Sequence, residues 1–328
     1  MRVFLLISLL GAAFASSSLP YNGGELLTNT VEVYIVWYGS WAQSNPVIAS
    51  TQNLIAHIGS STYWNTISKY TDANGVPASS NITFAKSIYV NSPYGNAWGT
   101  NDYSPQLIFA AMKAGVFPAS ANNVYYVMLS PDVTMDGLCS NFCGYHSFFT
   151  VTTNIGTQLK LPYAIIGSPQ QCPRGCSISF QLKSYQAQYA SAAVNDYSPA
   201  EVVVHELAES ITDPTFVGYV NNNGNVETGD ICANELSDVH MAANGTLFDV
   251  TINGQNYMLA SLFDTALGAC VMEPGVDAQS YNVPPSQWSS AITHPPSPPA
   301  SFMPTSASRP AFVPVVSLLS LLFAAITW

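Results

Sequence analysis

The sequence predicts a single α+β domain in which a mixed β-sheet packs against helices. Stretches rich in β-branched and aromatic residues alternate with stretches of helical periodicity along most of the 328-residue chain. No period of 20–50 residues repeats, which argues against a solenoid or a propeller. Between its two terminal segments the chain has about 255 residues, a length that one domain can reach.

Four elements are predicted in the first part of the chain. Residues 31–39, VEVYIVWYG, are β-branched and aromatic and indicate a buried strand. Residues 46–70 carry isoleucine and leucine at helical spacing, as one helix or as two helices broken near Gly59. Residues 82–90 predict a strand. Residues 104–115 begin with Ser-Pro and end with glycine, which favours a helix.

The second part of the chain predicts two more strands, a helix and a hairpin. The strands are expected at 123–131 and 163–169, where aliphatic and aromatic residues run together. Ser198-Pro199-Ala200-Glu201 has the pattern of a capping box with proline at the first helical position, so a helix should run over 199–211. Asn253-Gly254 lies between two alternating runs and indicates a tight hairpin.

The two ends of the chain predict a secreted protein that is attached to a surface. Residues 1–15 have one basic residue, an apolar run and a small-residue cleavage site, as in a signal peptide. The domain then spans 16–275, and a Pro/Ser-rich stalk spans 276–304. Residues 305–328 end in an apolar tail that favours a glycosylphosphatidylinositol (GPI) attachment signal. A C-terminal membrane helix is the alternative.

The charge of the chain excludes one class of partner. The formal net charge is −11 and only eight lysines and arginines are scattered over the sequence. A nucleic-acid-binding protein needs clustered positive charge to neutralise phosphates, so no nucleic-acid partner is expected. Two N-x-S/T sequons predict N-glycosylation at Asn81 and Asn244 in a secreted context.

Six cysteines in a secreted chain predict a disulfide framework rather than a four-cysteine zinc site. Two pairs have the spacing C-x3-C, and the sequence does not determine which cysteines are joined. We expect local bridges within each C-x3-C pair and a longer loop closed by the remaining pair. The expected bridges are Cys139–Cys143, Cys172–Cys176 and Cys232–Cys270.

The stretch VVVHELAESITDP, residues 202–214, places a histidine and two glutamates on a short apolar helix. His205 and Glu209 are four residues apart and therefore share one face. In the zinc-peptidase signature H-E-x-x-H, both histidines bind zinc and the first glutamate is the general base. Here Glu206 occupies the base position and Glu209 replaces the second histidine. The stretch therefore predicts a zincin-like metal helix with Glu206 as catalytic residue.

A third metal ligand must come from further along the chain, and the segment GNVETGDIC holds the best candidates. Asp230 is preferred and Glu227 is the second choice, because nearby glycines can bring this loop back to the helix. Carboxylate oxygens bind zinc, so the pattern predicts a divalent metal, with Zn²⁺ first. Ligation rich in oxygen shifts the preference toward Mn²⁺, Ca²⁺ or Mg²⁺.

A structural role for the same helix is the competing interpretation. Acidic residues four apart are common on helices, and His205 could be a core histidine bonded to Glu209 or Glu201. His146 is a further candidate for a polar group in the cleft, with a structural role favoured. Met258 is assigned to the core.

Six blocks of the sequence carry a resemblance to a known family. They are YIVWYGSW, DGLCSNFCGYHSFF, SPQQCPRGC, HELAESITDPTFVGY, ETGDIC and NGQNYMLASLFD. Their order and spacing resemble those of the plant EXORDIUM, or phosphate-induced protein 1, family over residues 30–272. Membership implies a secreted protein linked to cell expansion and growth. The family's microbial relatives carry a similar H-E-x-x-E helix followed by an E-x-G-D segment, which supports the downstream ligands. The C-terminal anchor signal is a departure from the typical plant member.

Two classes of function follow from these features. The first is a zincin-like extracellular hydrolase, or its inactive descendant, linked to cell growth or the cell wall. The second is a non-catalytic surface protein that binds glycans or another extracellular or cell-wall partner. No G-x-S-x-G elbow, phosphate loop or paired-carboxylate spacing indicates another enzyme class.

Overall fold

The structure is a computed structural model of the chain. It describes residues 19–153, 155–192, 198–221, 226–233 and 235–273, together with 276–277 and 279–280. The predicted signal peptide, nearly all of the predicted stalk and the C-terminal apolar segment lie outside the described residues, so these three features stay predictions. Within the described part of the chain, no helix has the length and apolar composition needed to cross a membrane.

A mixed five-stranded sheet forms the centre of the domain, which confirms the predicted α+β fold. Its order is β2-β1-β3-β5-β4, with four parallel strands and an antiparallel β4 at one edge. The strands are β1 (Val31–Tyr38), β2 (Ile82–Val90), β3 (Val124–Leu129), β4 (Gly144–Thr152) and β5 (Gln158–Ile166).

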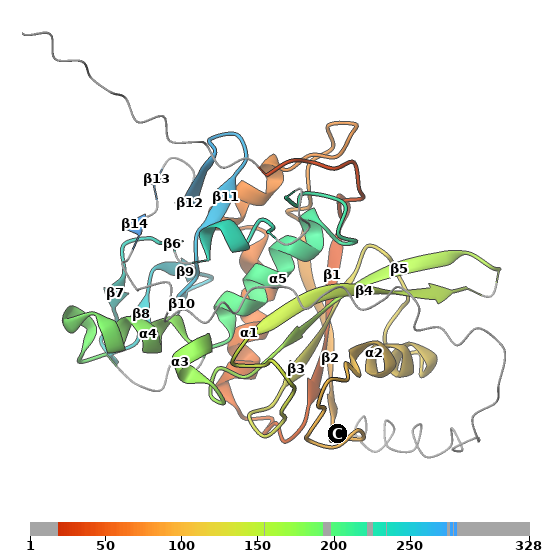
Figure 1. The fold of residues 1–328 in the computed structure, drawn as a ribbon, viewed down its shortest axis with the longest axis horizontal. Coiled ribbons are helices and arrows are strands. Elements are labelled where there is room, and N and C mark those ends of the chain that lie inside the picture. The colour runs from red at the N-terminus through yellow and green to blue at the C-terminus, as the bar shows by residue number, and fades with distance from the viewer. Residues whose placement is uncertain are drawn as a thin grey trace, which may run out of the picture.

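Helices cover both faces of this sheet (Figure 1). The helices α1 (Pro46–Ile58) and α5 (Ala200–Thr212) pack on one face, and α2 (Ser104–Lys113) packs on the other. Alternate side chains of a strand point to opposite faces, so β1 contributes to both cores. Trp37 belongs to the core under α1 and α5, whereas Tyr38 belongs to the core under α2.

The remaining elements are short and connect or cover the central layers. The segment after α5 forms small antiparallel pairs that pack on the α1 and α5 side. The short elements before α5 are η1 (Tyr63–Lys69), α3 (Pro173–Cys176), α4 (Ile178–Tyr185) and η2 (Ala187–Tyr189). The short elements after α5 are η3 (Asp230–Cys232), β6 (Glu235–Leu236), β7 (His240–Met241), β8 (Leu247–Phe248), β9 (Val250–Ile252), β10 (Gln255–Tyr257), β11 (Leu262–Asp264), β12 (Ala269–Glu273), β13 (Val276–Asp277) and β14 (Gln279–Ser280).

Most predicted elements are present, and the differences have physical reasons. Asn253 and Gly254 both have positive φ and join β9 to β10, as the hairpin signal predicts. The expected second half of the helix over 46–70 is the 3-10 helix η1. Strand β4 was not predicted. It begins directly after Cys143, the second cysteine of the first C-x3-C pair, for which only a local disulfide was expected.

The predicted capping box of α5 is wrong. The Ser198 hydroxyl accepts a hydrogen bond from the Ala200 amide, only two residues away. The Glu201 carboxylate does not return to the helix start, because it accepts a hydrogen bond from the Ala260 amide. Glu201 therefore connects α5 to the segment between β10 and β11. Pro199 lies at the N-cap position rather than at the first helical position, which is Ala200, and it provides no side-chain cap.

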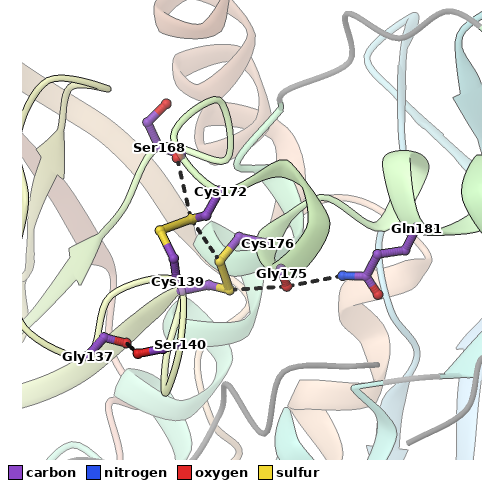
Figure 2. Close-up of a disulfide and its surroundings, with 9 residues drawn as sticks. Gly137, Cys139, Ser140, Ser168, Cys172, Gly175, Cys176 and Gln181 are labelled. Carbon is purple, nitrogen blue, oxygen red and sulfur yellow. Dashed lines mark hydrogen bonds between the residues drawn. A yellow bond between two sulfur atoms is a disulfide. The ribbon is translucent and has the colours of Figure 1, made fainter. Parts of the chain in front are cut away.

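Two of the three predicted disulfide pairings are also wrong. The bridges are Cys139–Cys172 and Cys143–Cys176, whereas the Cys232–Cys270 pairing is confirmed. Figure 2 shows the first two bridges side by side, between the loop before β4 and the single helical turn α3.

The helical turn explains why the local pairs do not form. Cys172 and Cys176 are four residues apart across α3, so their side chains point in the same direction. Their Sγ atoms approach to 3.4 Å without being bonded to each other. Each sulfur bonds instead to a cysteine of the facing loop, and the two bridges together fasten the start of β4 to the segment after β5.

The parallel bridges should stabilise the fold in a non-additive way. Once one has formed, the other closes a ring of about ten residues, which contributes about 3 kcal/mol in the loop-entropy model. Replacing Cys143 and Cys176 by alanine should therefore lower the free energy of unfolding by about 2.7 kcal/mol, and replacing the remaining pair as well should lower it by about 3.7 kcal/mol more, because the last bridge closes the loop of 33 residues. Urea unfolding of both variants measures these losses. Equal losses from the first and the second bridge would contradict this arrangement.

Candidate metal centre

The helix α5 carries its polar residues into the interior of the protein. All residues from Val202 to Thr212 are buried, because the sheet covers one side of the helix and the C-terminal segment covers the other. The side chains of His205 and Glu209 are 3% and 0% exposed. Their i,i+4 spacing brings His205 Nε2 within 3.1 Å of Glu209 Oε1. Two ionisable groups therefore meet inside the core.

The loop after α5 brings Asp230 to the same place. Asp230 Oδ1 lies 3.6 Å from His205 Nε2, and the Asp230 side chain is 7% exposed. The other carboxylate oxygen, Oδ2, accepts a hydrogen bond from the Glu227 amide. This local bond fixes the Asp230 side chain and leaves Oδ1 directed to the histidine. The Cys232–Cys270 disulfide anchors the loop two residues later.

A glycine allows this close approach of the loop to the histidine. A Cβ atom placed on Gly229 would lie 2.5 Å from His205 Nδ1 and 2.7 Å from its Cε1. The backbone of Gly229 has φ −75° and ψ −38°, which any residue can adopt. The need for glycine is therefore steric, because the loop backbone packs directly against the imidazole ring.

Glu209 also contributes to a second cluster, with His146 and Glu227. His146 Nε2 lies 3.0 and 3.2 Å from the two carboxylate oxygens of Glu227 and 3.9 Å from Glu209 Oε2. All three side chains are 0% exposed. His146 comes from the edge strand β4, where it pairs with Ala164 of β5. The sheet edge and the helix therefore contribute to the same buried centre.

The geometry of both clusters is compatible with divalent ions. Each cluster offers three ligand atoms that lie within 4.8 Å of one another. In a tetrahedral zinc site with bonds of about 2.0–2.1 Å, ligand atoms lie about 3.3–3.4 Å apart. The His205 contacts at 3.1 and 3.6 Å bracket this spacing. The structure thus brings His205, Glu209 and Asp230 together, while Glu227 faces His146.

Burial and crowding shift the protonation of the centre. Burial raises the pKa of Glu209, and the neighbouring charges of Asp230 and Glu227 raise it further, although His205 opposes them. Burial alone would lower the pKa of His205, but the charge of Glu209 and the carboxylates around it raise that pKa well above its usual value. The histidine therefore takes up a proton when no cation balances these carboxylates.

Glu206, the predicted base, is also buried, at 1% exposure. Its charge contributes to the raised pKa of His205, which places the carboxylate within electrostatic reach of the first cluster. It also contributes to the raised pKa of Tyr145 on β4, after burial and Asp102. It also contributes to the raised pKa of Tyr126 on the central strand β3, after burial, so Glu206 is close to the face of the sheet under α5.

Two residues around the centre were not predicted from the sequence. Asp213 follows the helix, and burial together with the charge of Glu227 raises its pKa to about 7. Its Oδ1 accepts a hydrogen bond from the Gly218 amide at 2.6 Å. Phe216 packs against His146 with the ring centroids 4.9 Å apart. The sequence predicted a helix that ends just before Asp213, but it did not show that the residues after this end support the centre.

Of the other residues that the sequence analysis named, Met258 and the two sequon asparagines lie away from the centre, whereas His146 lies within it. Met258 belongs to a separate core cluster with Ile178 and Leu182, as the core interpretation expected. Asn81 and Asn244 are exposed, and their glycosylation stays a prediction. His146, for which a structural role was favoured, lies in the centre itself.

The fold and the centre together define an α+β protein with a buried histidine–carboxylate cluster on its central helix. The chain belongs to the phosphate-induced protein 1 family, because the conserved region of that family matches residues 19–273. This match confirms the family that the sequence blocks indicated.

Known relatives are distant in sequence. Protein EXORDIUM-like 5 of Arabidopsis thaliana is 27% identical over 289 residues, covering 79% of this chain and 78% of the relative. Protein PHOSPHATE-INDUCED 1 of Nicotiana tabacum is 24% identical over 317 residues, covering 82% of this chain and 96% of the relative. No solved structure matches the chain.

The packing of Gly229 against the imidazole can be tested by a double-mutant cycle. Gly229→Ala should lower the free energy of unfolding by about 1–3 kcal/mol, because the new methyl group overlaps the ring of His205. In a His205→Ala background the same change should cost much less, since the ring is absent. Urea unfolding of the four proteins in EDTA measures both costs. Equal costs in the two backgrounds would contradict the contact.

Proposed function

We propose that this protein binds a divalent metal ion through His205, Glu209 and Asp230 and acts as a zincin-like hydrolase outside the cell. The observation that carries the proposal is the approach of three potential ligands from two separate segments, at 3.1 and 3.6 Å from His205 Nε2. A single histidine with two carboxylates is compatible with Zn²⁺ and also with Mn²⁺. Its role in cell growth or at the cell wall is inferred from the family resemblance.

The three proposed ligands and Glu206 have different roles in this proposal. His205 and Glu209 are held by one rigid helical turn, and Asp230 is oriented by its bond to the Glu227 amide. A bound divalent ion would supply positive charge to polarise a substrate carbonyl and to acidify water. Glu206 would accept a proton from the attacking water and return it to the leaving group.

The ligand set makes zinc-peptidase-like rates harder to reach. Two carboxylates cancel the charge of a divalent ion, whereas a set of two histidines and one carboxylate leaves one positive charge. A less positive centre acidifies water less. Metal binding and hydrolysis are therefore separate parts of the proposal and need separate tests.

A non-catalytic protein with a structural metal is the second candidate. The ligand side chains are only 0–7% exposed, and catalytic metal sites keep a position open for substrate. In this case the extracellular protein would bind glycans or a cell-wall partner through its surface, and the ion would stabilise the fold.

Metal content is the first test. The purified ectodomain should contain a divalent metal at one or more equivalents per chain, measured by inductively coupled plasma mass spectrometry after dialysis. His205→Ala should lose the ion held by His205, Glu209 and Asp230, so its metal content should fall by one equivalent per chain and EDTA should lower its thermal stability less than that of the wild type. His240→Ala is the matched control, because His240 is exposed on β7. A wild-type protein that stays metal-free after Zn²⁺ or Mn²⁺ addition would rule out the proposal.

The hydrolase half is tested with the metal-loaded protein on peptide, ester and cell-wall glycan libraries. Glu206→Gln should keep the metal and lower the rate about 10²–10⁴-fold, as expected for removal of a general base. Metal-loaded wild-type protein that cleaves none of these substrates would favour the second candidate.

The proposed location rests on the two chain ends and has its own test. The full chain, expressed in eukaryotic cells, should be released from their surface by phosphatidylinositol-specific phospholipase C, because the tail of 305–328 has the order of a lipid-attachment signal. An Arg-rich replacement of the apolar tail is the control and should be secreted without attachment. Retention in the membrane after treatment, with the tail still present by mass, would establish a membrane helix instead.

A further inference from the structure

The two oxygens of the Glu209 carboxylate face two different histidines. Oε1 lies 3.1 Å from His205 Nε2, and Oε2 lies 3.9 Å from His146 Nε2. The histidines come from α5 and from the edge strand β4, so Glu209 stands between two ligand sets. One set contains Asp230 and the other contains Glu227, and the sets have only Glu209 in common.

Glu209 has no hydrogen bond that would explain its position. Its side chain is 0% exposed, and within the described residues no donor is hydrogen-bonded to either carboxylate oxygen. The 3.1 Å contact with His205 involves Oε1 and is an ion pair when the imidazole is protonated. The nearest histidine nitrogen to Oε2 is 3.9 Å away, so this buried oxygen is the one that a second cation would stabilise.

The second set has the composition and spacing of a metal site in its own right. His146 Nε2 lies 3.0 Å from the nearer oxygen of Glu227, and all three residues of the set are 0% exposed. An ion pair between His146 and Glu227 would account for their contact. It would leave Oε2 of Glu209 at 3.9 Å from the imidazole, which is too far for a hydrogen bond.

The charge of the whole centre favours two ions over one. Glu206, Glu209 and Glu227 are 0–1% exposed, and the side chain of Asp230 is 7% exposed. Asp213 is also 0% exposed and interacts electrostatically with Glu227, so it adds a fifth acidic group. One divalent ion supplies two positive charges, fewer than the negative charges that these groups carry when ionised. Burial of uncompensated charge is costly, so the pair of ions is the better match.

We propose that His146, Glu209 and Glu227 hold a second divalent ion, and that the Glu209 carboxylate bridges it to the ion at His205 and Asp230. This inference rests on the proposed function, because it extends the same centre. In known two-metal sites the ions lie about 3.5–4 Å apart. A bridge through the two oxygens of one carboxylate fits the positions of the two histidines on either side of Glu209.

The number of ions per chain tests this inference. The metal-free protein is titrated with Zn²⁺ and, separately, with Mn²⁺, and the bound metal per chain is counted after gel filtration. Wild-type protein should bind two ions, and His146→Ala should bind one. In the Mn²⁺-loaded wild type, electron paramagnetic resonance should show exchange coupling between the ions, and His146→Ala should show an isolated Mn²⁺ signal.

Two further variants keep the test independent of folding. Glu227→Gln preserves the shape of the side chain and should also bind one ion, whereas His57→Ala changes a histidine of α1 outside both sets and should still bind two. Circular dichroism and disulfide mapping show that each variant is folded.

The outcomes separate the two proposals. One ion in the wild type that His205→Ala removes and His146→Ala retains would overturn the second site and leave the proposed function intact. One ion lost in both variants would show a single ion shared by the histidines, which also overturns the second site. Two ions that persist in His146→Ala would place the additional ion elsewhere, and no bound metal would overturn both proposals.

Discussion

The burial of several carboxylates around one helix is the constraint on which the rest of this structure depends. A charged carboxylate in a protein interior is stable only when a proton, a hydrogen-bonding network or a cation compensates its charge. Here Glu206 and Glu209 lie on α5, and Glu227 reaches the same region from the following loop. The raised pKa of Glu209 shows the cost of this crowding, with burial as its main cause. Burying these carboxylates without a compensating charge would destabilise the fold, which is why we attribute a bound cation to this centre.

The fold supplies the rigidity that such a centre needs. Strand β4 brings His146 to the edge of the sheet, and two parallel disulfides fasten the start of this strand to the segment after β5. The loop with Asp230 is anchored by the Cys232–Cys270 bridge and packs through Gly229 against the imidazole. The disulfides therefore lie on both segments that complete the site.

Local signals in the sequence were enough to predict the helix and its immediate chemistry. The i,i+4 spacing of His205 and Glu209 follows from helical geometry alone, and the glycines around Asp230 indicated a loop able to return to it. Long-range proximity was not predictable in the same way. The position of His146 depends on β4 lying beside β5, and the partners of Cys172 and Cys176 depend on which loop faces α3. A single sequence carries no local signal for either arrangement, so two of the three predicted disulfide pairings were wrong and His146 was assigned a structural role.

The central claim is that α5 is a metal-binding helix rather than an acidic structural one. The most direct measurement is anomalous diffraction from crystals of the protein soaked in Mn²⁺ or Zn²⁺, with data collected on both sides of the metal's absorption edge. The account predicts an anomalous peak within about 2–2.5 Å of His205 Nε2, a Glu209 oxygen and an Asp230 oxygen. A map without a peak at this position, in which the His205 imidazole donates an aligned hydrogen bond to Glu209, would contradict the account.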